Sequence, residues 1–301
     1  MEGKTKMTDK RIETKTSRTA EMTCISRAAS SLEADSHYHS EDYLAIKLLP
    51  GFFKALIQIP LFRKLFMHFL APTGLYEYVI ARTKYIDVVF KRALTDGFDQ
   101  ILLFGAGFDT RALRFQAEAQ RTHIYELDVP LTQQAKIQQY QKRGLVNPAN
   151  LVFIAIDFDK ELLPEKLDLA GFHKEHKSLF ILEGVLMYLE PESVRETFQT
   201  IWEYAGVGSR IVFDYVRASV LRGENTLFGE AGATQTVSQA GEGWQFGFEP
   251  DEVASFLAAY EFEISDHQCA QELEATYFQD NSGQPVGHIN GTHCIVTAVR
   301  R

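Results

Sequence analysis

The segment ILLFGAGFDTRALRF, residues 101–115, decides the fold class of this chain. An apolar run ends in Gly-Ala-Gly and an aspartate, and a helix-type sequence follows at once. This order is typical of the strand–turn–helix unit that begins a nucleotide-binding α/β domain. The dinucleotide fingerprint requires a third glycine at position 110, which is Thr110 here. The turn is therefore predicted to hold a ligand other than a dinucleotide pyrophosphate.

Apolar runs alternate with helix-type segments from residue 98 onward. Continuous apolar runs of this length are typical of strands that are covered on both faces. Their alternation with helices predicts right-handed β-α-β units and a parallel sheet in an α/β fold. The expected strands are 100–105, 123–128, 151–157, 178–184, 209–216, 262–267 and 292–299.

Composition divides the chain into three parts. Residues 1–20 carry six Lys or Arg and three acids without an apolar stretch, which predicts a disordered tail. Residues 21–97 contain helix-type segments without strand-type runs, which predicts a helical cap. Residues 98–301 form the predicted core. Within it, the Gly-rich insertion at 217–250 is too long for an ordinary connection and is expected to be a lid.

The most apolar segment is GFFKALIQIPLFRKLFMHFLAP, residues 51–72. Basic residues and Pro60 interrupt it, so it is shorter than the roughly 20 apolar residues that a membrane span needs. We expect two short helices packed on the main domain. Two alternatives stay open, a lining for an apolar substrate pocket and docking on a membrane surface.

Charge and cysteine content restrict the partners of the chain. A net charge of −9 argues against nucleic acid or an anionic membrane as the main partner and leaves room only for a local basic patch. Cys24, Cys269 and Cys294 lie far apart and form no C-x-x-C motif, which predicts no disulfide framework and a cytoplasmic location. The histidine pairs at 37/39 and 173/176 have no evident third ligand, so no metal site is expected.

Acidic residues follow the first four predicted strands, at Asp109, Asp128, Asp157 and Glu183. The carboxyl ends of parallel strands meet at one edge of a sheet, where ligands bind. Asp128 comes 21 residues after Gly107, at a distance where a carboxylate accepts both hydroxyls of a ribose.

This set of acids favours one ligand. Several carboxylates repel a phosphate and attract a cation that carries a ribose. S-adenosylmethionine combines a sulfonium, an amino group and a ribose. Gly105 and Gly107 would let the backbone approach it closely. Asp157 and Phe158 would bind the adenine amino group and stack on the ring.

Five segments resemble, in sequence order, the leucine carboxyl methyltransferase family, and in particular its bacterial branch of polyketide O-methyltransferases, typified by the tetracenomycin carboxyl methyltransferase. They are ARTKYID, LFGAGFDTRALRF, YELDVPLTQQAK, ILEGVLMYL and GWQFGF. The resemblance covers residues 18 to 300. It implies a Rossmann-like class I methyltransferase fold, with a seven-stranded, mostly parallel sheet, an antiparallel last strand and an N-terminal helical cap.

The resemblance also implies roles for single residues. Arg82 would hold the methionine carboxylate of S-adenosylmethionine, and Glu183 would face its amino group. Tyr188, five residues after Glu183, would lie near the transferred methyl group as the catalytic residue. The remaining cofactor contacts would come from Gly105, Gly107, Asp128, Asp157 and Phe158.

The chemistry of the acceptor follows from the residues at the strand ends. A carboxylate is ionised at neutral pH and needs no general base, whereas a phenol with a pKa around 10 needs one. We expect no histidine among the strand-end residues, which favours a small carboxylate acceptor, although His68 of the predicted cap or a residue of the lid could supply a base. A phenolic hydroxyl or a protein C-terminal carboxylate stays open. So do two other functions, an NAD-dependent oxidoreductase and a non-catalytic nucleoside-binding or partner-binding module.

Overall fold

The computed structural model describes residues 17–65, 71–158, 161–241 and 243–301. Most of the predicted disordered tail, residues 1–16, and His68 lie outside the described residues. Helix α1 begins at Arg18, with the Ser17 side chain accepting a hydrogen bond from the N–H of Ala20 at 3.2 Å. Residues 18–20 are thus the first turn of a capped helix.

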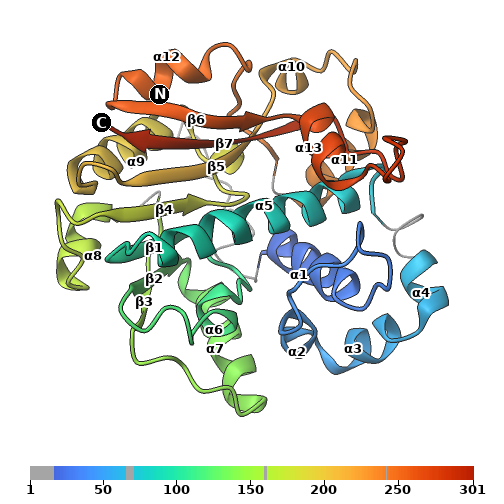
Figure 1. The fold of residues 1–301 in the computed structure, drawn as a ribbon, viewed down its shortest axis with the longest axis horizontal. Helices are drawn as coiled ribbons and strands as arrows, with labels where there is room; N and C mark the ends of the chain where they lie inside the picture. The colour runs from blue at the N-terminus through green and yellow to red at the C-terminus, as the bar shows by residue number, and fades with distance from the viewer. Residues whose placement is uncertain (1–16, 66–70, 159–160, 242) are drawn as a thin grey trace, which may run out of the picture.

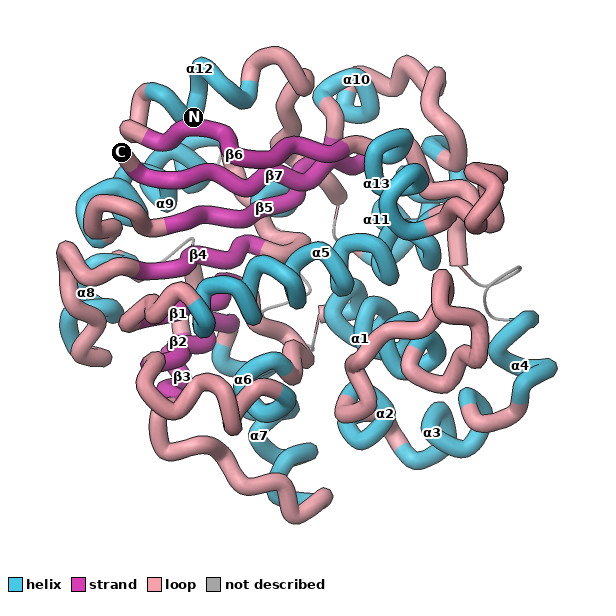
Figure 2. Tube along the Cα trace, viewed as in Figure 1, coloured by secondary structure: helices cyan, strands magenta, loops and turns pink. Residues whose placement is uncertain are grey.

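A seven-stranded sheet in the order β3-β2-β1-β4-β5-β7-β6 forms the centre of the fold (Figures 1 and 2). Strand β7 is antiparallel to both β5 and β6, and the other pairs are parallel. The predicted α/β class and the antiparallel last strand are confirmed. The strands are β1 Gln100–Phe104, β2 His123–Asp128, β3 Leu151–Ala155, β4 Ser178–Leu182, β5 Arg210–Val216, β6 Phe262–Gln268 and β7 His293–Arg300.

Helices cover both faces of this sheet and extend beyond one of its edges. Proline begins α7, α9 and α4, in keeping with its preference for the first helical turn. The helices are α1 Arg18–Ser30, α2 Ala45–Leu48, α3 Gly51–Ile57, α4 Pro60–Leu65, α5 Leu75–Thr95, α6 Arg111–Arg114, α7 Pro130–Lys142, α8 Leu163–Leu169, η3 Leu186–Tyr188, α9 Pro191–Tyr204, α10 Ala218–Leu221, α11 Glu230–Ala240, α12 Val253–Ala258 and α13 Ala270–Tyr277.

Alternate residues of the central strands supply two separate cores. Ile101 and Leu103 of β1 pack in the core that contains α5, whereas Leu102 and Phe104 pack in the core that contains α9. Every residue of β1 and β4 is buried, as expected for parallel strands covered on both faces. A ligand can therefore reach the sheet only where its strands end and not across its faces.

The N-terminal helices lie beyond the edge at which the parallel strands end. In Figure 1, α1 to α4 are at the right of the sheet, and α5 crosses its front face. The predicted insertion at 217–250 contains α10 and α11, and Phe248 pairs with Arg217 in an isolated bridge. Two short helices at 51–65 are confirmed, but they pack less than expected. Ile57 is the buried residue of α3, and no described residue of α4 is buried.

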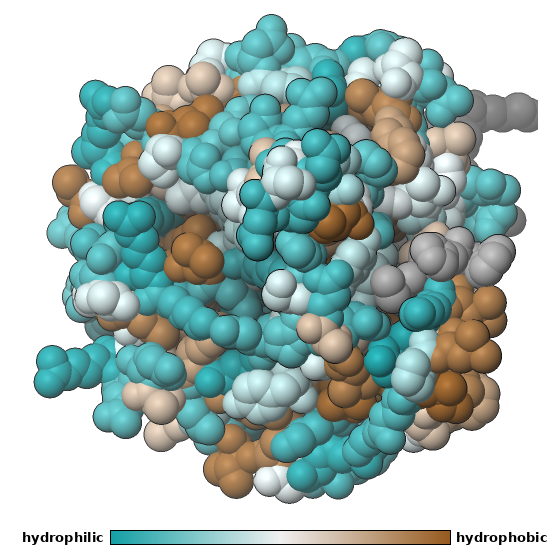
Figure 3. Space-filling view, turned by 45° about the vertical axis from the view of Figure 1, so that its right-hand side comes forward, coloured by the Kyte–Doolittle hydropathy of each residue, from teal (hydrophilic) through white to brown (hydrophobic). Residues whose placement is uncertain are grey.

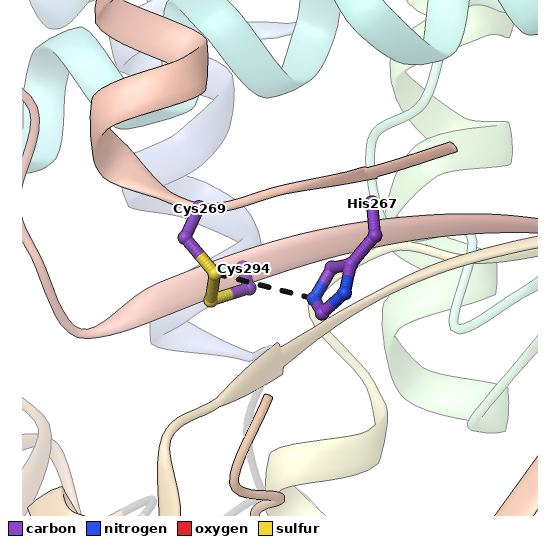
Figure 4. A group of neighbouring side chains, drawn as sticks. All are labelled: His267, Cys269 and Cys294. Carbon is purple, nitrogen blue, oxygen red and sulfur yellow. Dashed lines mark hydrogen bonds between the residues drawn. A yellow bond between two sulfur atoms is a disulfide. The ribbon is translucent and has the colours of Figure 1, made fainter. Parts of the chain in front are cut away.

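Two cysteines expected to be free are joined. Cys269 and Cys294 form a disulfide between the end of β6 and β7, so the expectation of no disulfide is wrong (Figure 4). Residues 25 positions apart come together because β6 and β7 are antiparallel neighbours. Cys24 is a buried free thiol, and burial raises its pKa to about 12. No helix among the described residues is both long and apolar enough to cross a membrane.

A buried ion pair joins α7 to β2. Lys136 Nζ lies 2.6 Å from Glu126 Oε2, and each side chain is 1% exposed. Burial raises the pKa of Glu126 to about 7, although Lys136 opposes this shift. The second carboxylate oxygen, Oε1, accepts no hydrogen bond from the described residues. The ionised form of Glu126 therefore depends on Lys136.

We predict that Lys136→Met lowers the free energy of unfolding by about 3 kcal/mol at pH 8, because a buried carboxylate loses its counter-ion. The loss should shrink below pH 6. Because the pKa of Glu126 is raised in the folded protein, Glu126 takes up a proton as the pH falls through about 7. The variant then no longer holds an unpaired buried carboxylate, so its loss of stability becomes smaller. Urea denaturation at both pH values measures this. Lys142→Met, at the end of the same helix, is the matched control, and an equal loss at both pH values would contradict the electrostatic explanation.

Candidate active site

A cavity of about 370 Å³ lies at the carboxyl ends of the parallel strands. This volume is within the usual range for small-molecule sites. The residues around it come from the glycine turn, from the ends of β2, β3 and β4, from α1 and α5, and from positions 241, 243 and 245. All eight residues predicted from the sequence line it, namely Arg82, Gly105, Gly107, Asp128, Asp157, Phe158, Glu183 and Tyr188.

The glycine turn has a backbone conformation that side chains disfavour. Gly105 has φ +55° and Gly107 has φ +48°. A Cβ at Gly105 would lie 2.7 Å from Val185 Cγ2, and one at Gly107 would lie 3.2 Å from the Cβ of Ala20 in α1. The positive φ favours glycine at both positions, and at Gly105 a side chain would also lack space. The turn brings backbone atoms, rather than side chains, to the cavity.

Asp128 lies at the end of β2 beside this turn. Its carboxylate accepts hydrogen bonds from the N–H groups of Gly107 at 2.5 Å and Val129 at 2.7 Å. Burial raises the pKa of Asp128 to about 6, although these two bonds oppose the shift. It forms no ion pair with the described residues. Its remaining lone pairs suit neutral hydroxyl donors such as those of a ribose.

Arg82 of α5 is held by two acids. Its Nη1 donates to Asp214 Oδ2 at 2.7 Å, and its Nε lies 3.1 Å from Glu183 Oε1. Asp214, in β5, also accepts from the Tyr78 hydroxyl at 2.9 Å and from the Gly184 N–H at 2.6 Å. The sequence analysis missed Asp214. The pattern used for the other strands, an acid near the end of an apolar run, could have identified Asp214 as well.

Arg111 neutralises two of the four acids predicted at the strand ends. It contacts Asp109, donates to Glu183 Oε2 at 2.7 Å and donates to Asp87 Oδ1 at 2.7 Å. Burial alone would raise the pKa of Asp109, but Arg111, Lys136 and Arg27 together outweigh it, and the pKa falls to about 2. Asp109 and Glu183 line the cavity together with Asp128 and Asp157, but Arg111 neutralises the first two, so they do not act as free anions toward a ligand. Asp109 is a structural anion.

The contacts of Arg82 and Arg111 belong to a larger buried group, which we call the arginine–carboxylate network. Asp87 binds Arg114 at 2.6 Å, Arg114 lies 3.5 Å from Asp42, and Asp42 binds Arg27 of α1 at 2.7 Å. The network contains four arginines and five carboxylates, which leaves one excess negative charge. Its members are Arg27, Arg82, Arg111, Arg114, Asp42, Asp87, Asp109, Glu183 and Asp214.

Helix α1 covers the cavity, which the sequence did not indicate. Arg27 Nη2 donates to the backbone oxygen of Phe108 in the glycine turn at 2.9 Å. Ser17, Thr19, Ala20 and Thr23 also line the cavity. The segment is polar and lacks a strong apolar face, and residues 17–20 fall within the stretch predicted to be a disordered tail. No local signal in this stretch indicates that it folds over the turn.

Aromatic side chains stand at two sides of the cavity. Phe158 follows Asp157 at the end of β3 and stacks on Phe104, with ring centroids 6.0 Å apart and an interplanar angle of 26°. Tyr188 belongs to η3. Its hydroxyl lies 3.5 Å from Thr19 Oγ1, and its backbone oxygen accepts from Gln245 Nε2 at 2.8 Å. These contacts join η3, α1 and the insertion around one end of the cavity.

A histidine does lie at the strand-end edge, contrary to expectation. His293 begins β7, and because β7 is antiparallel, its first residue lies where the parallel strands end. Its ring stacks on Tyr78 with centroids 4.5 Å apart. Burial lowers its pKa to about 4, although Asp214 opposes the shift, so the imidazole is neutral at pH 7. It is not among the residues that line the cavity, so it has no direct access to an acceptor there.

One group of possible metal ligands occurs among the described residues, away from the histidine pairs singled out in the sequence. The ligand atoms of His267, Cys269 and Cys294 lie within 4.8 Å of one another. The two sulfur atoms are bonded to each other, and His267 Nε2 is 4.0 Å from Cys269 Sγ (Figure 4). Cysteine binds a metal as the free thiolate, so with the disulfide formed this group offers a single imidazole nitrogen.

Comparison with known proteins agrees with this geometry. A family model described as leucine carboxyl methyltransferase matches residues 20–202. The chain belongs to the leucine carboxyl methyltransferase family. A relative named as the S-adenosyl-L-methionine-dependent methyltransferase YktD of Bacillus subtilis (strain 168) is 28% identical over 211 residues, 70% of this chain and 67% of the relative.

Two further similarities extend this result. A relative named as the S-adenosyl-L-methionine-dependent methyltransferase SCO7813 of Streptomyces coelicolor is 28% identical over 223 residues, 74% of this chain and 75% of the relative. A solved structure, titled as a methyltransferase from Thermobifida fusca YX, aligns with a TM-score of 0.58 at 15% identity and covers 94% of this chain and 98% of that one. At this identity the structural similarity shows the fold alone. The chain is an S-adenosylmethionine-dependent methyltransferase.

The residues around the cavity fit this cofactor in shape and charge. Arg82 Nε is a buried donor without a well-aligned acceptor among the described residues, which suits an added carboxylate. S-adenosylmethionine has one net positive charge, and the arginine–carboxylate network has one excess negative charge. Asp128 also lines the cavity and lies outside this network, so the site as a whole offers negative charge to a cationic ligand.

We predict that Asp128→Ala weakens S-adenosylhomocysteine binding by about 2 kcal/mol, because charge-assisted hydrogen bonds are lost. In the unmodified protein the affinity should be constant above pH 7 and fall as the pH drops through about 6, where Asp128 is protonated. The variant should lose this pH dependence. Calorimetry at several pH values measures both effects.

Asp99→Ala serves as the matched control, since Asp99 is an exposed acid at the opposite end of β1. It should bind S-adenosylhomocysteine like the unmodified protein. Unchanged affinity in a folded Asp128→Ala protein would refute the ribose assignment.

Proposed function

We propose that this methyltransferase methylates an oxygen atom of a small acceptor, and that the acceptor group is a carboxylate. The observation that supports the proposal is that the described residues lining the cavity include no histidine, lysine or cysteine, while the lining acids Asp128, Asp157 and Glu183 are assigned here to the cofactor. A carboxylate is already ionised at neutral pH and needs no general base. A polyketide-type acid is one such acceptor, following the resemblance of the sequence to that branch.

Each predicted site residue has a role in this proposal. Arg82 binds the methionine carboxylate of the cofactor while Asp214 and Glu183 hold its guanidinium in place. Glu183 also faces the amino group. Gly105 and Gly107 bring the backbone close to the cofactor, and Asp128 accepts from the ribose hydroxyls. Asp157 and Phe158 contact the adenine.

The chain contributes mainly alignment and exclusion of water. When bound, S-adenosylmethionine supplies a methyl group on a positively charged sulfur. The residues around the cavity would hold an acceptor oxygen in line with that methyl group, so that transfer could leave S-adenosylhomocysteine as the other product. Tyr188 lies where it can orient that oxygen. The proposed lid, residues 217–250, contributes Gln245 and places Gly241 and Gly243 along the cavity, which helps to exclude water.

The type of product decides between the acceptor classes. With a carboxylate acceptor, the rate should stay nearly flat from about pH 6.5 to 8.5, because the nucleophile is ionised throughout. The product should be a methyl ester that releases methanol in mild alkali. The test is a screen of acidic and phenolic metabolites with labelled methyl donor, followed by alkaline treatment. Label that resists alkali would indicate an ether and overturn the carboxylate proposal.

We predict that Tyr188→Phe lowers kcat about tenfold while S-adenosylhomocysteine affinity changes less than twofold. The reason is that one hydrogen bond to the acceptor, worth about 1.4 kcal/mol, is lost in the transition state. Steady-state kinetics and calorimetry measure the two quantities. Tyr260→Phe is the control, because Tyr260 packs at the edge of the core that contains α9 and does not line the cavity. A parallel loss of cofactor affinity would mean that Tyr188 has a packing role instead.

A further inference from the structure

Helices α3 and α4 expose an apolar surface that the fold does not use. Its members are five large side chains within 14 residues, which we call the α3–α4 surface: Phe52 at 71% exposure, Phe53 at 38%, Ile59 at 50%, Leu61 at 76% and Leu65 at 50%. Hydrophobic side chains gather on this side of the molecule, at the lower right of Figure 3. Other strongly exposed apolar residues, such as Leu169 and Val207, belong to separate loops and helix ends.

This arrangement is costly in water and needs an explanation. Scattered exposed leucines are ordinary, but a contiguous apolar patch marks an interaction surface. Phe52 and Phe53 contact each other edge to face, with ring centroids 5.8 Å apart, and α3 packs directly on α4. Ile57 alone among the described residues of the two helices is buried, so these helices contribute little to the core.

The charge around the α3–α4 surface is opposite to that of the whole chain. Residues 43–76 contain Lys47, Lys54, Arg63 and Lys64 and no Asp or Glu, although the net charge of the chain is −9. Arg63 pairs with Glu33, whereas the three lysines form no ion pair with the described residues. The segment is therefore a local basic patch. At physiological salt the Debye length is about 8 Å, so the nearby lysines outweigh distant acids in the local field.

We infer that the α3–α4 surface docks the enzyme on an anionic lipid membrane. Short helices that combine exposed Phe and Leu with Lys and Arg lie in the plane of the lipid headgroups, with apolar side chains immersed and lysines near the phosphates. Symmetric contact between two copies of this face is disfavoured, because it brings the same lysines together. The inference does not depend on the methyl acceptor and goes beyond the proposed function.

Vesicle flotation of the full chain tests this inference. The probes are vesicles of phosphatidylcholine alone and of equal parts phosphatidylcholine and phosphatidylglycerol, in about 150 mM salt. The protein should bind the anionic vesicles and bind neutral ones at least about tenfold more weakly. Phe52→Ser/Leu61→Ser should reduce binding to anionic vesicles by about tenfold or more. Lys54→Gln/Lys64→Gln should reduce it by a similar factor, and only on anionic vesicles.

Leu169→Ser/Val207→Ser is the matched control, since these residues are 87% and 78% exposed and lie elsewhere. It should bind anionic vesicles like the unmodified protein. All variants should keep their melting temperature and S-adenosylhomocysteine affinity, which confirms that they fold. Either of two results would overturn the inference: no binding of the unmodified protein to anionic vesicles, or full binding by folded Phe52→Ser/Leu61→Ser. Binding through the basic N-terminal residues alone would give the second result. If the unmodified protein does not bind vesicles but forms a dimer, and Phe52→Ser/Leu61→Ser is monomeric, the surface is a contact between two copies instead.

Discussion

The pairing of buried arginines with buried carboxylates is the constraint on which the rest of the structure depends. A buried charge that loses its partner is far more costly than a lost surface contact. The network joins α1, the segment after it, α5, the glycine turn and the ends of β4 and β5, so displacement of any one of these leaves an unpaired charge. The N-terminal helices and the sheet are therefore coupled by electrostatics as well as by apolar packing.

The same network separates two aspartates that look alike in the sequence. Asp109 and Asp128 both follow strands, and both are buried. Asp109 is bound by Arg111 and its pKa is lowered, which makes it part of the framework. Asp128 receives only backbone N–H groups among the described residues and its pKa is raised. A buried carboxylate with a raised pKa and no ion-pair partner among the described residues can accept hydrogen bonds from an uncharged donor on a ligand.

Sequence reasoning predicted the features that depend on local patterns. Apolar runs located the seven strands to within about two residues, and the glycine turn located the cavity. Features that depend on contacts between distant residues were not predictable in this way. Arg27 reaches the backbone of Phe108 across 81 positions, and the sulfur atoms of Cys269 and Cys294 meet only because β7 lies beside β6. The partners of Asp109 and Glu183 were missed for the same reason, since a carboxylate shows no sign in the sequence of which arginine will neutralise it.

The position of β7 has a consequence for biosynthesis. This strand is the last in the sequence, yet it lies between β5 and β6 and pairs with both. Until residues 293–300 have left the ribosome, β5 has an open edge and β6 has no neighbour in the sheet. Unpaired strand edges invite association with other chains. The nascent protein therefore passes through a stage in which the half of the sheet beyond β4 cannot be completed, however fast the rest of the chain folds.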